Sequence, residues 1–376
     1  MVVTVVHPAA YSNSYKPLLY PSTHLTEEPF WGWETLVKET NDMKNNRYSI
    51  SIRHALMLLV FLLGLPSSGF GFTQSFRQDG IWFQFVNAWD KTVEVFGCDK
   101  TLAQDVVIPS SVNYEGIHYK VITIGDKAFY GRDNLTSIEL PNSVITIGDR
   151  AFYGCHNLTS IELPNSVTTI GDFAFKDCSS LSKEIVIPSN VTEIADTAFM
   201  GCSSLPSVRL TNNVTSIGNH AFDGCKAFKS FTFTPRITSI GNSAFRNCGG
   251  LTSIKLPSKV DQLGDYAFAD CENLESAIFN SNVEINTTTF VNDAKLKTLT
   301  SPAYYFDGVA LYDKEKTNLI KVFDYTLSEY TGIPETVTTI GEHAFKDCTN
   351  LSKVNMPFGL ISVGDDAFNN CEKLAS

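Results

Sequence analysis

The sequence has no apolar run long enough to span a membrane and no cluster of basic residues. Its longest apolar run, Ala55 to Leu65, has about 11 residues, whereas a spanning helix needs about 20. The chain has 29 Lys and Arg against 40 Asp and Glu, a net charge of −11. This balance counts against nucleic acid or an anionic membrane surface as the main partner. Because 43% of the 376 residues are hydrophobic, the chain can bury a core.

Motifs that carry chemistry are also missing. The 7 His residues are scattered, and the sequence contains no nucleophile motif, P-loop or HExxH. No general acid and base recur at matching repeat positions, and no CxxC or paired His accompanies the cysteines. We therefore expect no catalytic residue, no cofactor and no metal, so the chain is not predicted to be an enzyme.

The run Ala55 to Leu65 fits a secretory signal peptide. Basic residues, the last of them Arg53, precede it, and small residues follow it. Met43 is well placed to start such a signal. We therefore predict a non-native N-terminal extension over residues 1–42, a signal peptide over 43–71, and no membrane insertion after cleavage. An uncleaved signal anchor is the alternative.

Most of the remaining sequence consists of copies of one unit, VITIGDRAFYGCHNLTSIELPNS. The period of about 23 residues lies in the range of leucine-rich repeats. Such a unit cannot bury its own apolar face, so the units must stack. The sequence predicts an α/β repeat solenoid of leucine-rich-repeat type. The copies begin at Val121, Val144, Val167, Val191, Val214, Ile237, Val260, Val337 and Leu360.

Two short strands are expected in each unit. Ile161 and Leu163 alternate with Ser160 and Glu162, which predicts a strand with one buried face. Stacked copies of this strand form a parallel β-sheet on one face of the solenoid. Residues 167–170 are predicted to form a second short extended segment.

Short helical turns are expected on the other face. Gly171 permits a bend, Asp172 is placed to cap a helical turn, and Phe175 and Cys178 point inward. The recurring Phe predicts an aromatic spine, and the recurring Cys is interpreted as a small buried residue rather than a disulfide partner. These positions hold Phe129, Phe152, Phe175, Phe199, Phe222, Phe245, Phe268, Phe345 and Phe368, and Cys155, Cys178, Cys202, Cys225, Cys248, Cys271, Cys348 and Cys371.

The recurring Asp has a second interpretation, because ladders of Asp bind Ca²⁺ in some β-solenoids. One carboxylate per layer offers too few oxygens for Ca²⁺. Asn219 and Asn242 replace the Asp as helix caps would, so capping is the expected role. The column holds Asp126, Asp149, Asp172, Asp196, Asp265 and Asp365.

Two segments depart from the repeat pattern. Each starts with Asp-Gly, continues with two alternating strands typical of a β-hairpin, and ends with Ile-Pro. We interpret the second segment as a second use of the N-terminal cap, and expect it to project from the solenoid. The predicted organisation is an N-terminal β-hairpin cap with a degenerate first repeat over 72–120, repeats over 121–301, a β-hairpin insertion over 302–336, and repeats with a truncated end over 337–376.

Recognition is expected on outward strand positions, because the repeat leaves these residues free to vary. Aromatic residues of the hairpins, namely Trp82, Trp89, Tyr304, Tyr305 and Tyr312, are the alternative anchors. The predicted ligand-binding residues are Glu139, Glu162, Glu184, Arg209, Thr232, Lys255, Ile278, Lys353 and Asn355.

The pattern V-T-x-I-G-x-x-A-F-x-x-C-x-x-L-x-S-I-x-L-P, which Val144 to Pro164 fits nearly throughout, resembles the BspA-like leucine-rich repeats of bacterial surface proteins. The resemblance covers roughly residues 79–376. It implies a secreted or cell-surface protein that adheres to host extracellular-matrix or plasma proteins or to another microbe. Arg132 and Ala195 depart from the pattern, and no surface anchor is recognisable.

The leading hypothesis is therefore an exported, non-enzymatic protein that binds a protein ligand. The alternative is a structural or targeting repeat region of a longer secreted protein whose catalytic domain lies beyond Ser376. A third interpretation, an intracellular scaffold, requires that Ala55 to Leu65 is not a signal. Neither the ligand nor the source organism can be derived from these residues.

Overall fold

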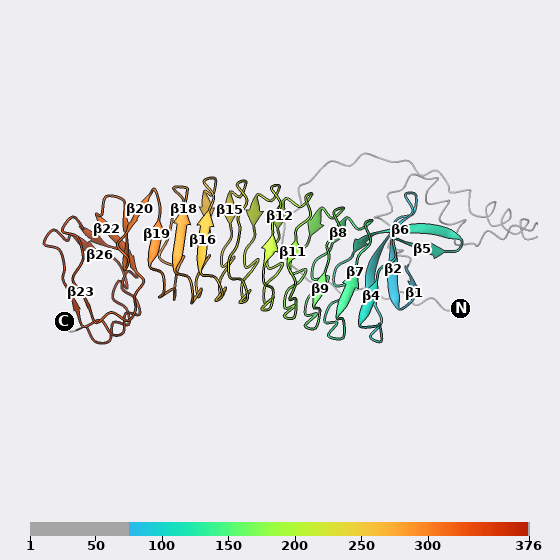
Figure 1. The fold of residues 1–376 in the computed structure, drawn as a ribbon, viewed down its shortest axis with the longest axis horizontal. Coiled ribbons are helices and arrows are strands. Elements are labelled where there is room, and N and C mark those ends of the chain that lie inside the picture. Colours follow the sequence, from blue (N-terminus) through green and yellow to red (C-terminus); the bar gives the residue numbers. More distant parts are fainter. Residues whose placement is uncertain (1–74, 375–376) are drawn as a thin grey trace, which may run out of the picture. The chain divides into compact units, whose positions relative to one another are not determined.

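The computed structural model describes residues 75–374. The predicted extension over 1–42 and the signal peptide over 43–71 lie outside the described residues. The described part consists of short strands joined by turns and contains no helix, so none that could cross a membrane. The strands follow one another along a stack of repeats, as Figure 1 shows.

Two columns of parallel strands run along the stack. In the first strand column, strands of neighbouring units pair in register, for example Ile138 with Ile161 and Lys255 with Ile278. The strand pairing lapses after Ile161 and, apart from a bridge between Ser230 and Ser253, after Arg209. The members of this column are β4 (Asp105–Val107), β7 (Ser137–Glu139), β9 (Ser160–Ile161), β11 (Ile185–Val186), β13 (Val208–Arg209), β16 (Ser253–Leu256), β18 (Ser276–Phe279) and β19 (Thr298–Thr300).

The second strand column is built from the short extended segments. Ile217 pairs with Ile240, and Ile240 pairs with Leu263. Its members are β6 (Ile117–Ile124), β8 (Thr146–Ile147), β10 (Thr169–Ile170), β12 (Glu193–Ile194), β14 (Ser216–Ile217), β15 (Ser239–Ile240) and β17 (Gln262–Leu263). Both predicted strands of the unit are thereby confirmed.

The expected helical turns are wrong. In residues 171–178 the backbone N–H groups alternate between two kinds of acceptor. Ala174 donates to the carbonyl of Gly171 in its own turn at 3.3 Å, and Phe175 donates to the carbonyl of Ala198 in the next layer at 2.8 Å. An α-helix requires bonds within its own segment, from each residue to the fourth before it. Phe173 has a φ of 59° and Asp177 a φ of 60°, which a right-handed helix excludes. The segment is a series of turns whose second set of hydrogen bonds joins neighbouring repeats.

The recurring Asp does not cap its own turn either. Asp149 Oδ1 accepts the backbone N–H of Asp172 at 2.9 Å, and Asp172 Oδ1 accepts that of Asp196 at 3.1 Å. Asn219 Oδ1 accepts the N–H of Asn242 at 2.8 Å, which explains why Asn replaces Asp in two layers. The column is therefore a hydrogen-bonded ladder between repeats.

The ladder places carboxylates of like charge in successive layers. Partial burial and the neighbouring carboxylates of Asp149 and Asp196 raise the pKa of Asp172. A raised pKa means that ionisation is unfavourable in the folded state. The penalty is fully present at neutral pH and disappears below the ordinary pKa of Asp, about 3.9.

We therefore predict opposite effects for two substitutions of Asp172. Asp172→Ala removes the acceptor of the Asp196 N–H and should destabilise the protein by about 1 kcal/mol. Asp172→Asn keeps the acceptor and removes the charge, so it should raise the melting temperature at pH 7 and lose this advantage below about pH 4. Asn219→Asp is the matched control and should lower the melting temperature at pH 7. Equal melting temperatures at pH 7 for wild type, Asp172→Asn and Asn219→Asp would contradict the ladder.

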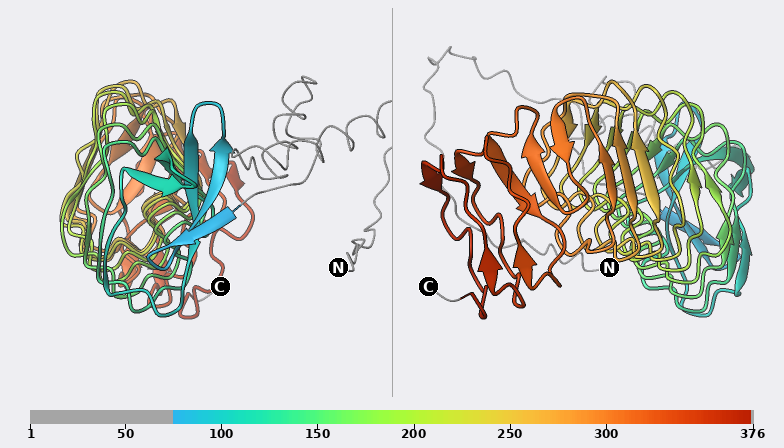
Figure 2. Two further views of the ribbon diagram at one scale, coloured as in Figure 1. Left: turned by 90° about the vertical axis from the view of Figure 1, so that its right-hand side faces the viewer. Right: turned by 60° about the vertical axis from the view of Figure 1, so that its left-hand side comes forward.

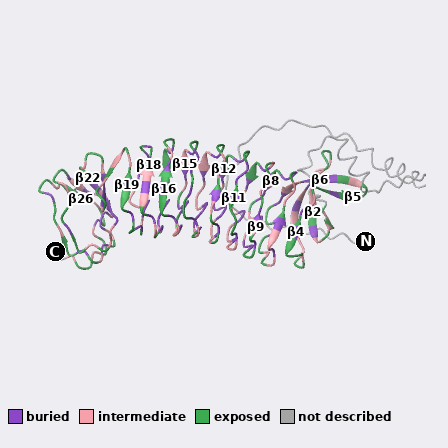
Figure 3. Ribbon diagram, viewed as in Figure 1, coloured by how far each residue is buried: buried purple, intermediate pink, exposed green. Residues whose placement is uncertain are grey.

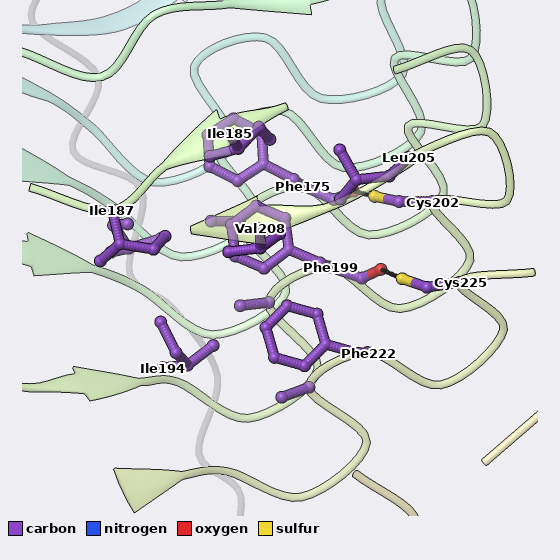
Figure 4. Packing of buried hydrophobic residues seen from close by; sticks show 14 of the residues in the cluster. Phe175, Ile185, Ile187, Ile194, Phe199, Cys202, Leu205, Val208, Phe222 and Cys225 are labelled. Atoms are coloured by element: carbon purple, nitrogen blue, oxygen red, sulfur yellow. Dashed lines mark hydrogen bonds between the residues drawn. The ribbon is translucent and has the colours of Figure 1, made fainter. Parts of the chain in front are cut away.

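Buried segments recur in repeat after repeat along the stack, as the burial colours in Figure 3 show. The recurring Phe rings form the predicted spine: Phe152 and Phe175 stack with centroids 5.2 Å apart and planes 4° apart. Figure 4 shows Phe175, Phe199 and Phe222 one above the other. The Cys225 thiol donates to the Phe199 carbonyl at 3.3 Å, so the buried Cys also supplies a contact between layers.

The N-terminal cap is an antiparallel meander. It consists of β1 (Ser75–Gln78), β2 (Ile81–Asn87) and β3 (Thr92–Cys98), and β3 then pairs in parallel with β6. A second hairpin joins β5 (Ser111–Tyr114) to β6. Figure 2, left, views this end of the solenoid. The meander covers the second strand column, whereas β4 forms the edge of the first within the described residues.

The segment after β19 has the same strand topology as the N-terminal cap, as expected if it is a second copy of that cap. β20 (Tyr304–Phe306), β21 (Ala310–Asp313) and β22 (Asn318–Val322) form an antiparallel meander, and β22 pairs in parallel with β24 (Thr339–Ile340). The segment therefore does not project from the solenoid, since β22 is a layer of the stack. Two strand pairs complete this end: β24 with β26 (Ser362–Val363), and β23 (Glu329–Tyr330) with β25 (Lys353–Val354). The residue limits given above for the segments remain predictions.

Candidate functional site

The outward residues of the first strand column form one face. The register pairs Val186 with Arg209, and Lys255 with Ile278, which pairs with Thr300. All of these side chains are exposed except that of Ile278, which is half-buried. We call this row and the row of Ser beside it the outward face. The structure therefore brings seven of the nine predicted binding residues together: Glu139, Glu162, Glu184, Arg209, Thr232, Lys255 and Ile278.

The remaining two predicted residues lie elsewhere. Lys353 and Asn355 belong to the strand region of β25, which pairs with β23 and not with the strands before the insertion. Lys353 also faces Glu329, with Nζ and Oε2 3.9 Å apart. These two residues form a separate short strip beyond the second meander.

Charge on the outward face changes along the stack. Its first layers carry the exposed carboxylates of Glu139 and Glu162. In the middle, Glu184 accepts a hydrogen bond from the Ser207 hydroxyl at 3.2 Å and lies 3.4 Å from Arg209 Nε. Lys255 follows two layers later and pairs its strand with the apolar Ile278. A partner lying along this face would contact acidic groups first, then the Glu184–Arg209 ion pair, and then a basic and an apolar group. This uneven distribution of charge can fix one orientation of the partner.

Four of the five aromatic anchors predicted in the hairpins fall into two groups, and the fifth, Tyr304, is half-buried against the core. Trp82 and Tyr305 are exposed, and Trp89 is 67% exposed. Tyr312 is fully buried, and its hydroxyl lies 2.5 Å from that of Tyr330. Tyr312 is therefore a structural residue of the second meander and cannot anchor a partner.

The sequence did not predict a groove that lies on the second strand column. It has a volume of about 460 Å³ and is lined by β14, β15 and β17 and by the glycine that follows each of them. Ser216, Ser239 and Gln262 occupy the equivalent outward strand position in its three layers.

Residues 75–374 show no arrangement typical of a metal site or of an activated cysteine nucleophile. No three His, Cys, Asp or Glu side chains gather there as a set of metal ligands. Burial raises the pKa of the column thiols, such as Cys202 and Cys248, so they stay protonated at neutral pH. The arrangement offers surfaces for binding and, in this part of the chain, no assembled nucleophile.

Comparison with known proteins agrees with this geometry. The family described as BspA type leucine rich repeat region matches in six copies, over residues 106–205, 192–308 and 320–376. A leucine rich cell surface protein from Faecalibacterium prausnitzii is 30% identical over 80% of this chain and 75% of that chain, with a TM-score of 0.58. A leucine-rich repeat protein from Bacteroides ovatus is 27% identical over 80% of this chain and 93% of that chain, with a TM-score of 0.51. No curated protein matches the sequence.

Proposed function

This chain belongs to the BspA-type leucine-rich repeat family, and from that membership we propose that it is exported and binds a protein ligand through its outward face. Leucine-rich repeat proteins generally mediate protein–protein interaction, and stacked repeats offer extended surfaces for it. A similar structure is described as a cell surface protein, which supports a secreted or surface location for this chain. The proposed ligand is a host extracellular-matrix or plasma protein or a surface protein of another microbe.

One observation carries the assignment to the outward face. Inward positions repeat the same residue types layer after layer, whereas the exposed outward positions change from Glu162 to Arg209 to Lys255 along the first strand column. Stacking therefore explains the constant residues and leaves the variable ones available for recognition. The proposed function requires no catalytic step.

Reversing charge on the outward face should weaken binding without affecting the fold. We expect the double variant Arg209→Glu, Lys255→Glu to bind immobilised fibronectin or fibrinogen at least about tenfold more weakly than wild type, since charge reversal of an interface residue often exceeds 1.4 kcal/mol. Its melting temperature should change little, because both side chains are exposed. Surface plasmon resonance and calorimetry measure the two quantities.

The matched control is Arg236→Glu, Lys259→Glu. It reverses two exposed charges in turns that precede the second strand column and has the same net charge. We expect it to bind as wild type does. Equally weakened binding in both double variants would indicate a general effect of net charge. Unchanged binding in both would instead indicate that the ligand contacts the exposed hairpin aromatics Trp82, Trp89 and Tyr305.

A further inference from the structure

Both strand columns of the first repeat array end at the joint between β19 and the second meander. Within the described residues, no backbone pairing connects β17 or β19 to the strands that follow. The Phe spine also changes there, because Phe290 meets Phe323 edge-on, with planes 81° apart, instead of stacking on it. The buried apolar core continues across the joint, because Leu311 and Phe323 of the second meander belong to the cluster of the first array, whereas Tyr312 and Leu319 belong to a second cluster.

An aspartate occupies the cysteine position in the last layer before the joint. Asp293 precedes Leu296 by three residues, as Cys271 precedes Leu274. It is completely buried, and its Oδ1 accepts the backbone N–H of Cys271 at 2.7 Å. Its Oδ2 has no hydrogen-bond partner within the described structure. A buried carboxylate with one oxygen unpaired is tolerated far better as the neutral acid than as the anion.

Groups from both sides of the joint face Asp293. Asp270 and the Cys271 thiol lie on the side of the first array. Tyr325 lies on the other side, with its buried hydroxyl against the Asn292 backbone but short of regular hydrogen-bond geometry.

Further titratable groups lie near Tyr325. Lys321 is 4% exposed, donates to the His343 carbonyl at 3.2 Å, and holds its ammonium 5.6 Å from the Tyr325 ring centre. Asp347 and Cys348 influence both Tyr325 and Lys321. None of these groups hydrogen-bonds to Asp293 Oδ2, so nothing in the described joint neutralises the anion directly.

We propose that this joint is a pH-dependent hinge, closed while Asp293 is protonated and opening when Asp293 ionises. Because no strand pairing crosses the joint within the described residues, local opening there breaks side-chain contacts, such as that of Phe290 with Phe323, and no strand column. Opening exposes the Asp293 carboxylate to water, which stabilises the anion.

The direction of the pH effect follows from burial. Burial raises the pKa of Asp293 well above its ordinary value, with the Asp270 carboxylate adding to the rise. The closed joint therefore holds a proton that the open joint releases. Closure is most favourable in acid and weakens as the pH rises from the ordinary pKa of Asp toward the raised one, by about tenfold per pH unit for one proton.

Hydrogen exchange measures this opening directly in the full chain. After correction for intrinsic rates, amides of residues 290–296 and 319–327 in wild type should exchange faster as the pH rises above the ordinary pKa of Asp, by at most about tenfold per pH unit. Amides of residues 144–178 serve as the internal reference and should show no such slope. In Asp293→Asn the slope should vanish, because the amide does not ionise.

Two further variants complete the test. Asp293→Cys restores the residue used by the rest of the column and should also remove the slope, which guards against misfolding of the Asn variant. Asp172→Asn removes a carboxyl of raised pKa from the intact array and should leave the slope unchanged. A flat profile in wild type, or a slope that persists in both Asp293 variants, would overturn the proposal.

Discussion

Replacing Phe175 by alanine should lower the free energy of unfolding by about 3 to 5 kcal/mol. The side chain is completely buried and stacks between Phe152 and Phe199, with centroids 5.2 and 5.3 Å away. Its removal leaves a cavity bordered by two layers, and neither layer can close it without breaking the backbone bonds between repeats. Chemical denaturation followed by circular dichroism measures the loss.

Phe173→Ala is the matched control for this prediction. Phe173 is two residues away, is half-buried, and lies on the surface beneath the Arg150 guanidinium at 4.5 Å. It also has a positive φ, so its backbone conformation is already unfavourable. We expect a change below about 1 kcal/mol. Comparable losses at both positions would show that the spine contributes no more than a surface aromatic residue.

Gly171→Ala should destabilise the protein by about 3 kcal/mol, at the upper end of the range for overpacking. A Cβ at this position would overlap the Asp149 carboxylate and lie 2.7 Å from the Asp149 backbone nitrogen and 2.8 Å from the Gly148 carbonyl carbon. Two of these atoms belong to the backbone of the preceding layer, so no side-chain rotation relieves the contact. The layers must separate, which weakens the Asp ladder at the same point.

Gly249→Ala provides the comparison. A Cβ there meets no atom within 4 Å, and the residue does not have a positive φ. The substitution reduces the freedom of the unfolded chain and should leave stability unchanged or raise it by up to about 1 kcal/mol. A loss at Gly249 as large as at Gly171 would contradict the role assigned to the glycine column. Thermal unfolding of both variants under one condition makes the comparison.

Features that depend on one residue and its own strand were predictable from sequence. The alternation around Ile161 identified the first strand column, and the recurring Phe identified the spine. The repeated Asp-Gly and Ile-Pro pairs identified a second cap, which the structure bears out in the pairing of β20, β21 and β22. Each of these patterns reports a local periodicity or a turn, and such signals are present in the linear sequence.

Features that depend on contacts between layers were not predictable in the same way. An Asp after Gly fits a helix cap, and only the position of the next layer shows that Asp149 accepts the N–H of Asp172. The turn around Phe173 fits a helical period, but alternate N–H groups bond to the next repeat and prevent a helix. The expected projection of the insertion was wrong for a related reason, since β22 replaces a strand of the stack.

Part of the candidate site was predictable from the sequence and part was not, for the same reason. The alignment of repeats placed Arg209 and Lys255 on one face, because equivalent positions of a solenoid share a face. It also grouped Lys353 with them, although the joint separates β25 from that face. Asp293 takes the position of a column cysteine, but its complete burial and its unpaired Oδ2 become visible only in the structure.

We propose that inward positions of a repeat determine the fold and outward positions determine recognition. Saturation mutagenesis of residues 191–213 tests it in one measurement, with displayed protein sorted in parallel for folding and for fibronectin or fibrinogen binding. We predict that substitutions of Phe199, Cys202 and Val208 reduce folding and binding together, whereas those of Arg209 reduce binding alone. Binding losses that follow folding losses at every position, including Arg209, would contradict the account.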